Sequence, residues 1–373
     1  MNPLRQLAEF GQSLWVDNLQ RSYITQGTLK KFIDGDGLKG LTSNPTIFQK
    51  AVSGSEDYQD LFDAAKGKGV SGNDVYEQLA VRDVQGAADI LRPVYDSLKG
   101  QDGYASLEVS PRLALDTKGT LEEARRLWKT LARPNVMIKV PGTVPGVPAF
   151  EQLTAEGINV NVTLLFSQER YREIAHAYVA GLEKFAASGG DVSRVASVAS
   201  FFVSRIDALV DKEIEKKVKA GVTAEQQKAL ESLSGKVAIA NAKLAYRAFK
   251  EVFSGARWEA LAKKGARVQR VLWASTSTKS PKLRDVLYVE ELIGRDTVNT
   301  MPPATIDAFR DHGKVRPSLE EDLPAAEATM RQLETSGISM KTVTDELATD
   351  GIRLFEESFD KLLSAVGEKL AKQ

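Results

Sequence analysis

The feature that most constrains the fold is a regular alternation of two local patterns. Short apolar runs rich in β-branched residues recur along the chain, and stretches with the 3.6-residue periodicity of a helix follow them. Strands that alternate with helices indicate a parallel sheet, and eight such runs favour a closed (β/α)8 TIM barrel over a doubly wound sheet. The candidate strands are residues 13–18, 37–44, 104–110, 135–140, 159–165, 195–203, 268–276 and 297–301.

The rest of the chain is predicted to be helical additions to one barrel. Helical patterns near residues 57–99 and 222–264 are longer than a barrel helix needs, so we interpret them as insertions. No glycine-rich linker divides the sequence, and we therefore expect a single domain over residues 1–373.

A C-terminal helix is expected near residues 345–373. Six apolar residues there can share one face, which favours packing on the barrel over binding to a partner protein. They are Ile352, Leu354, Phe355, Phe359, Leu362 and Leu363.

Composition excludes several classes of function. The chain has 50 basic and 50 acidic residues, whereas nucleic-acid binding normally requires a basic excess. It has no cysteine, and its two histidines, His176 and His312, lie far apart in the sequence, so a Cys/His metal site is not expected. No segment resembles a signal peptide or a membrane span. We expect a cytoplasmic enzyme that needs no metal or cofactor and relies on Lys, Asp, Glu, Ser, Thr and Arg.

One lysine interrupts an apolar strand. In NVMIKVPG, Val136, Ile138 and Val140 share one face, and Met137 and Lys139 share the other. Burial disfavours a charged ammonium and leaves a fraction of free amine, which Schiff-base formation with a ketone requires. The alternative is an edge-strand lysine whose amine reaches solvent.

Polar residues recur at the ends of other candidate strands. Alternation places Asp17 with Trp15, Glu108 with Ser106 and Ser110, Asn161 with Asn159 and Thr163, Asn44 beside Thr42, and Ser275 with Trp273 and Ser277. Singly, each could be a structural hydrogen-bonding group. Together they predict a catalytic site, because the C-terminal ends of the strands converge at one end of a barrel.

These segments resemble the transaldolase family. The matching motifs are WVDNL (15–19), GLTSNPTIF (40–48), SLEVSPRLA (106–114), NVMIKVPGT (135–143), GINVNVTLLFS (157–167) and NTMPPATI (299–306). They occur in the family's order over residues 13–310. The chain resembles the longer branch of the family, and we expect no fused isomerase.

The resemblance implies catalytic roles for four residues. It implies that Lys139, on the fourth strand, is the Schiff-base nucleophile, as the strand count independently suggests. Asp17 resembles the general acid/base that acts on the C4 hydroxyl. Glu108 and Thr163 resemble the pair that positions a catalytic water.

The resemblance also implies substrate-binding residues. Asn44 and Asn161 match residues that contact the dihydroxyacetone unit, and Ser200 and Arg205 match a phosphate-binding pair.

One departure affects the phosphate site. Ser275 keeps its place, but Ser277 stands where another branch of the family has an arginine. We hypothesise that Lys279 supplies the second cation; the alternative is a solvated loop lysine, with helix N-terminal amides holding the phosphate.

The implied activity is transfer of a dihydroxyacetone unit in the non-oxidative pentose phosphate pathway. The donor would be sedoheptulose 7-phosphate or fructose 6-phosphate, and the acceptor glyceraldehyde 3-phosphate or erythrose 4-phosphate. A class I fructose-6-phosphate aldolase is the nearest alternative, which Glu108 disfavours because a tyrosine there would indicate the aldolase. A non-catalytic sugar-phosphate-binding barrel is another, although it should have lost Lys139, Asp17 or Glu108. We expect sugar phosphates as partners, no nucleic acid or membrane, and a monomer or homodimer.

Overall fold

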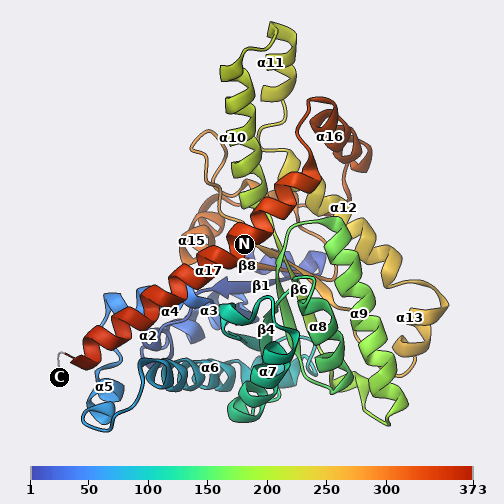
Figure 1. Cartoon of the computed structure of the whole chain (residues 1–373). Helices are drawn as coiled ribbons and strands as arrows, with labels where there is room; N and C mark the ends of the chain where they lie inside the picture. The colour runs from blue at the N-terminus through green and yellow to red at the C-terminus, as the bar shows by residue number, and fades with distance from the viewer. Residues whose placement is uncertain (1, 372–373) are drawn as a thin grey trace.

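A closed barrel of parallel strands forms the centre of the molecule. The computed structural model describes residues 2–371 and contains eight strands, each paired with its neighbours in chain order, with β1 beside β8 (Figure 1). The predicted (β/α)8 barrel is therefore confirmed. The strands are β1 (Gln12–Asp17), β2 (Gly40–Thr42), β3 (Tyr104–Glu108), β4 (Val136–Pro141), β5 (Val160–Leu165), β6 (Ser197–Phe202), β7 (Arg270–Ala274) and β8 (Thr297–Met301).

Helices surround the barrel and cross one of its ends. Before β5 they are α1 (Pro3–Gln6), η1 (Leu7–Phe10), α2 (Arg21–Thr25), α3 (Thr28–Asp36), α4 (Pro45–Gly54), α5 (Gln59–Ala65), α6 (Gly72–Ser97), η2 (Pro111–Leu113), α7 (Thr117–Leu131) and α8 (Gly146–Ala155). After β5 they are α9 (Gln168–Ala187), η3 (Val192–Arg194), α10 (Ser204–Ala220), α11 (Ala224–Glu231), α12 (Val237–Val252), α13 (Gly255–Ala262), α14 (Leu287–Glu291), α15 (Pro303–His312), η4 (Ser318–Glu320), α16 (Leu323–Thr335) and α17 (Met340–Ala371).

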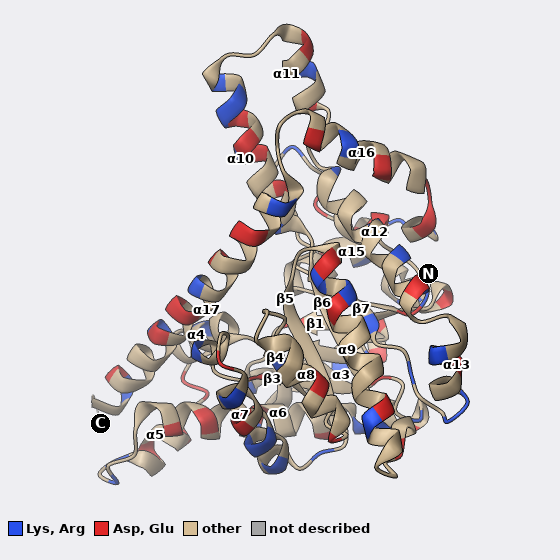
Figure 2. Ribbon diagram, turned by 45° about the vertical axis from the view of Figure 1, so that its right-hand side comes forward, with Lys and Arg blue, Asp and Glu red and all other residues tan. Residues whose placement is uncertain are grey.

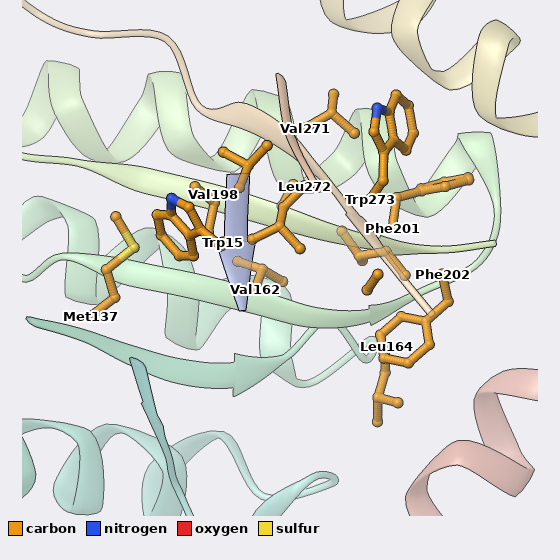
Figure 3. Close-up of a cluster of buried hydrophobic side chains, with 14 of the residues drawn as sticks. Trp15, Met137, Val162, Leu164, Val198, Phe201, Phe202, Val271, Leu272 and Trp273 are labelled. Atoms are coloured by element: carbon orange, nitrogen blue, oxygen red, sulfur yellow. The ribbon is translucent and has the colours of Figure 1, made fainter. Parts of the chain in front are cut away.

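Apolar side chains fill both the barrel and the layer between strands and helices. Trp15, fully buried, fills the space beside β2 so tightly that a Cβ on Gly40 would lie 2.4 Å from its ring. Its indole nitrogen donates to Asp102 over 2.8 Å. On the outer layer, Trp273 packs edge-on against Phe201, and Phe201 packs against Tyr171 of α9. Figure 3 shows Trp15, Phe201 and Trp273 within this buried set.

Strand register sets the level at which the polar residues meet. Glu108 of β3 pairs with Lys139 of β4, and Lys139 pairs with Asn161 of β5. Asp17 of β1 pairs with Thr42 of β2. Side chains at one level of a barrel that share a face point into the same layer. The candidate site residues are therefore brought together by register at the C-terminal ends of the strands.

The two long helical stretches contribute to the ring of helices as well as projecting from it. In the first, α6 packs on β3 and α7; in the second, α12 packs against α9 and α16. These helices take ring positions, whereas α11 of the second stretch projects away from the barrel in both views, together with α10, which precedes that stretch (Figures 1 and 2).

The C-terminal helix packs on the barrel. It begins at Met340, earlier than expected, and residues 372–373 of the predicted helix lie outside the described residues. Phe355, Phe359 and Leu362 are buried, but Leu354 is 39% exposed and so does not share their face. The helix packs on α4, α6 and α10, and it crosses the end of the barrel in Figure 1.

Charged residues are distributed along the helices. Figure 2 shows positions of Lys and Arg interspersed with those of Asp and Glu on the helices, while the strands carry few of either. Within residues 2–371, no helix has the length and apolar character needed to span a bilayer.

Candidate active site

Lys139 lies inside the barrel on β4. Its side chain is only 5% exposed, and its amine donates to the carbonyl of Ser43 over 3.2 Å. The amine is 3.4 Å from Oε2 of Glu108, and its distance to the ring centre of Phe355 is 5.9 Å. The amine thus has one carboxylate, one carbonyl and one aromatic ring around it.

Glu108 and Thr163 stand on the strands either side of Lys139. Glu108 Oε2 and Thr163 Oγ1 are both buried, and neither accepts or donates a hydrogen bond among the residues that the structure describes. Burial raises the pKa of Glu108, and the positive charge of Lys139 lowers it only in part. A buried polar atom normally has a partner. These two atoms are therefore suited to hold a water or a substrate hydroxyl beside the amine.

Asp17 ends β1 at the same opening. Its carboxylate accepts a hydrogen bond from Thr42 Oγ1 over 2.7 Å, and Thr42 also contacts Thr300 Oγ1 over 2.8 Å. Burial raises the pKa of Asp17 above its ordinary value, and of the neighbouring charges Lys139 opposes this most strongly. A carboxyl group with a raised pKa can exchange protons with a hydroxyl near neutral pH more readily than an exposed one.

A hydrogen-bonded chain of uncharged groups runs beside the lysine. Asn161 is fully buried; its amide nitrogen donates to Ser106 Oγ over 3.2 Å, and its oxygen accepts from Ser200 Oγ over 2.7 Å. Ser200, which the resemblance assigns to the phosphate site together with Arg205, is therefore joined to Asn161. This geometry fits a contact with the uncharged part of a sugar better than one with its phosphate.

Asn44 joins β2 to α4 and faces the opening. Its side-chain oxygen accepts from the backbone nitrogen of Ile47 over 3.0 Å, which caps α4. Since one end of the amide is used by the helix cap, only its nitrogen remains to donate to a ligand.

The rim of the opening carries three cations. Arg205, at the start of α10, faces Lys279 and Lys50, and none of the three forms an ion pair within residues 2–371. Burial, followed by repulsion from Arg205 and Lys50, lowers the pKa of Lys279. The Lys279 amine donates to Ser277 Oγ over 3.0 Å, so Ser277 orients the lysine.

Ser275 lies beside this rim because of its backbone conformation. Strict alternation predicted that it would share a face with Trp273, but Trp273 packs on the outer layer. Ser275 has a φ of 57°, a left-handed conformation that interrupts the alternation just after β7. Its hydroxyl therefore reaches the opening and contacts Ser204 Oγ over 2.8 Å.

Most of the predicted site residues line one pocket of about 260 Å³. It is lined by Asp17, Asn44, Lys139, Thr163, Ser200, Arg205, Ser275 and Lys279. Glu108 and Asn161 do not line it: Asn161 is covered by its hydrogen-bond partners, and Glu108 faces a neighbouring pocket of about 340 Å³. Asp17 and Glu108 are both close enough to Lys139 for its positive charge to offset part of the rise in their pKa values.

Sequence reasoning missed several residues that line this pocket, and two of them, Lys50 and Phe355, bear on its chemistry. Lys50 lies on α4, which begins directly at the end of β2, so residues in its first two turns were candidates for the rim. Phe355 comes from α17. The amphipathic pattern of that helix did not indicate which surface of the barrel the helix would cover. No set of three or more His, Asp or Glu side chains within residues 2–371 is arranged to hold a metal ion.

The fold and the site together define a class. A buried lysine on the fourth strand of a (β/α)8 barrel, paired with one carboxylate and in one pocket with another, is suited to a barrel enzyme that works through a Schiff base.

Comparison with known proteins then identifies the family. Residues 14–366 match the family model described as transaldolase/fructose-6-phosphate aldolase. A protein of Nostoc punctiforme named transaldolase 2 is 49% identical over 99% of this chain and 98% of its own. Transaldolases of Trichodesmium erythraeum and Thermobifida fusca are each 47% identical, over 100% and 99% of this chain and 98% and 99% of their own. The chain belongs to the transaldolase/fructose-6-phosphate aldolase family.

Proposed function

We propose that this chain is a transaldolase, a transferase that moves a dihydroxyacetone unit from a ketose phosphate to an aldose phosphate. The observation that carries the proposal is the position of the Lys139 amine, 3.4 Å from Glu108 and in one pocket with Asp17. The full-length similarity to proteins named transaldolase supports the same reaction.

The first stage forms the Schiff base. Lys139 attacks the C2 carbonyl of the ketose, and the carbinolamine loses water to give an iminium ion. Glu108 and Thr163, through a water held by their buried side-chain oxygen atoms, carry the protons that this step moves. The raised pKa of Glu108 suits a group that must both take and give a proton.

The second stage breaks and remakes a carbon–carbon bond. Asp17 takes the proton of the C4 hydroxyl, C3–C4 breaks, and its electron pair passes into the iminium to give an enamine. An aldose phosphate leaves, and a second aldose phosphate receives C3. Asp17 then returns its proton to the new alkoxide, and hydrolysis of the iminium frees Lys139.

The residues that line the pocket support a choice of donor and acceptor substrates. The amide nitrogen of Asn44 and the hydroxyl of Ser200 face the space beside Lys139, which suits the hydroxyls of dihydroxyacetone. We propose sedoheptulose 7-phosphate or fructose 6-phosphate as the donor, and glyceraldehyde 3-phosphate or erythrose 4-phosphate as the acceptor. The reaction then belongs to the non-oxidative pentose phosphate pathway.

The proposal is tested by supplying fructose 6-phosphate with and without erythrose 4-phosphate. A transaldolase forms sedoheptulose 7-phosphate only when the acceptor is present and releases little free dihydroxyacetone. Free dihydroxyacetone formed as fast without the acceptor as product is formed with it would instead indicate the aldolase.

We place the phosphate of each substrate at the cationic rim. A sugar phosphate brings nearly two negative charges, and Arg205 alone offers one fork of donors. Arg205→Met and Lys279→Met should each raise the KM for fructose 6-phosphate by about tenfold, equivalent to ~1.4 kcal/mol. The rate of transfer from free dihydroxyacetone to unphosphorylated glyceraldehyde should barely change, because neither of these substrates has a phosphate.

A matched control is Lys282→Met, which removes a lysine from the same loop outside the pocket and should leave KM unchanged. Lys50→Met measures whether the third cation contributes. An unchanged KM in Lys279→Met alongside a raised KM in Arg205→Met would show that Lys279 is only a surface residue.

We further propose that residues 1–373 act as one domain in the cytoplasm, where phosphorylated sugars are metabolised. Equal numbers of basic and acidic residues support small anionic substrates as its partners rather than nucleic acid. We propose a monomer or homodimer as the working form.

A further inference from the structure

Helix α17 is fastened across the catalytic end of the barrel. Ser358 accepts a hydrogen bond from Thr46 of α4 over 2.9 Å, and Asp360 pairs with Arg112 over 2.6 Å. Near its end, the amine of Lys369 donates to the carbonyl of Ser55 over 2.8 Å. The C-terminal half of the helix is thus held by residues of α4 and η2 and by the residue that follows α4, beside the opening that the helix crosses in Figure 1.

A glycine allows α17 to lie close to the strand ends. A Cβ on Gly351 would be 2.9 Å from Cδ2 of Leu164, the residue that follows Thr163 in β5. Residues four apart lie on the same face of a helix. Close approach at Gly351 therefore directs Phe355 toward the opening.

Phe355 covers the reactive amine. It is 5% exposed and lines the same pocket as Lys139, with its ring centre 5.9 Å from the amine nitrogen. The groups nearest the amine are otherwise a carboxylate and a carbonyl. The ring therefore puts an apolar surface on one side of a polar centre, where it limits the access of water.

Access of water matters most after C3–C4 cleavage, because the enamine has two possible fates. It can attack the C1 carbonyl of an acceptor aldose, which forms a new carbon–carbon bond. It can instead take a proton from water or an acid at C3 and become an iminium again. Addition of water at C2 and cleavage of the C2–N bond then release free dihydroxyacetone and the lysine amine. The second route uses one water molecule overall and loses the transferable unit.

We propose that Phe355 is a specificity-determining residue that protects the enamine from protonation and so favours transfer over release. This rests on the proposed transaldolase function and goes beyond it, since it assigns α17 a part in choosing between the two reactions. Phe355 acts on the intermediate by excluding water and takes part in no proton transfer.

The test compares Phe355→Ala and Phe355→Leu with the unaltered protein. The measured quantity is the rate of free dihydroxyacetone release from fructose 6-phosphate divided by the rate of transfer to erythrose 4-phosphate. In Phe355→Ala this ratio should rise by about tenfold, or ~1.4 kcal/mol in the difference between two barriers. Phe355→Leu keeps an apolar cover and should stay close to the unaltered ratio. An unchanged ratio in Phe355→Ala overturns the proposal.

Two controls separate the ring from the helix. Leu354→Ala removes the exposed neighbour of Phe355 and should leave the ratio unchanged. Phe359→Ala weakens the packing of α17 on Tyr76 and removes no side chain from the pocket that holds Lys139, so it should also keep the ratio. A rise in Phe359→Ala as large as that in Phe355→Ala would show that helix anchoring is responsible, which contradicts the proposal. Absence of transfer in the unaltered protein would instead count against the proposed function.

Discussion

Lys139→Arg should lower the rate of transfer by at least about 10⁴-fold, because loss of a covalent nucleophile lowers enzymatic rates by factors of this size or more. Arginine preserves the positive charge and much of the length of the side chain. Its guanidinium stays protonated at neutral pH, however, and cannot attack a carbonyl. The loss should appear in steady-state transfer from fructose 6-phosphate to erythrose 4-phosphate, and no adduct should be trapped by borohydride.

Lys243→Arg provides a matched control for this variant. Lys243 is also buried, but it lies on α12, where its amine donates to the carbonyl of Glu321 over 2.9 Å. The same exchange at that position should leave transfer within a few-fold of the unaltered rate. Thermal unfolding of both variants checks that each is folded. Substantial transfer by folded Lys139→Arg would rule out Lys139 as the nucleophile.

Asp17→Asn and Glu108→Gln should fail at different steps. Without the Asp17 carboxylate, the Schiff base should still form, but C3–C4 cleavage should slow by about 10²–10⁴-fold. Asparagine keeps an oxygen to accept from Thr42, so the local hydrogen bond is preserved. Without the Glu108 carboxylate, formation of the Schiff base itself should slow, because that group lies beside the amine.

Single-turnover experiments with rapid borohydride quenching distinguish these steps. The Asp17→Asn protein should accumulate an adduct that retains the whole ketose phosphate. In the Glu108→Gln protein, the trapped adduct should form more slowly than in the unaltered protein. If Asp17→Asn gives no adduct, the carboxylate of Asp17 acts before cleavage and its proposed role is wrong.

Much of the barrel could be predicted from sequence because its strands are short, apolar and regularly spaced. All eight predicted strands are present, although several are shorter than expected. The second strand was predicted over residues 37–44 but spans only Gly40–Thr42, since Gly37 adopts a φ of 74° and ends α3. Local turn conformation, which the apolar pattern does not encode, set that boundary.

Prediction of the site was limited by departures from regular geometry. Alternation correctly placed Met137 and Lys139 apart from Val136, but it failed at Ser275, where a left-handed residue changes which side chain points inward. Ser200 was matched to a phosphate-binding residue through a motif, and the motif did not indicate that its hydroxyl would bond Asn161 of the neighbouring strand. Hydrogen-bond partners depend on neighbouring strands, and no single segment contains that information.

Contacts between distant parts of the chain were the least accessible to sequence reasoning. The apolar face of the C-terminal segment was predicted, but not that Phe355 would cover Lys139 on a strand more than 200 residues earlier. Leu354 was placed on that face as well, yet it is exposed, because the face continues through Gly351 instead. A helical pattern predicts which residues of a helix are buried only to within about one position.

The central claim is that Lys139 forms the Schiff base, and borohydride trapping of the unaltered protein tests it most directly. The protein is incubated with fructose 6-phosphate, reduced with borohydride, digested and mapped by peptide mass spectrometry. The account predicts loss of activity together with a reduced three-carbon adduct on the peptide that contains Lys139. An adduct found only on another lysine, or inactivation with no adduct, would contradict it.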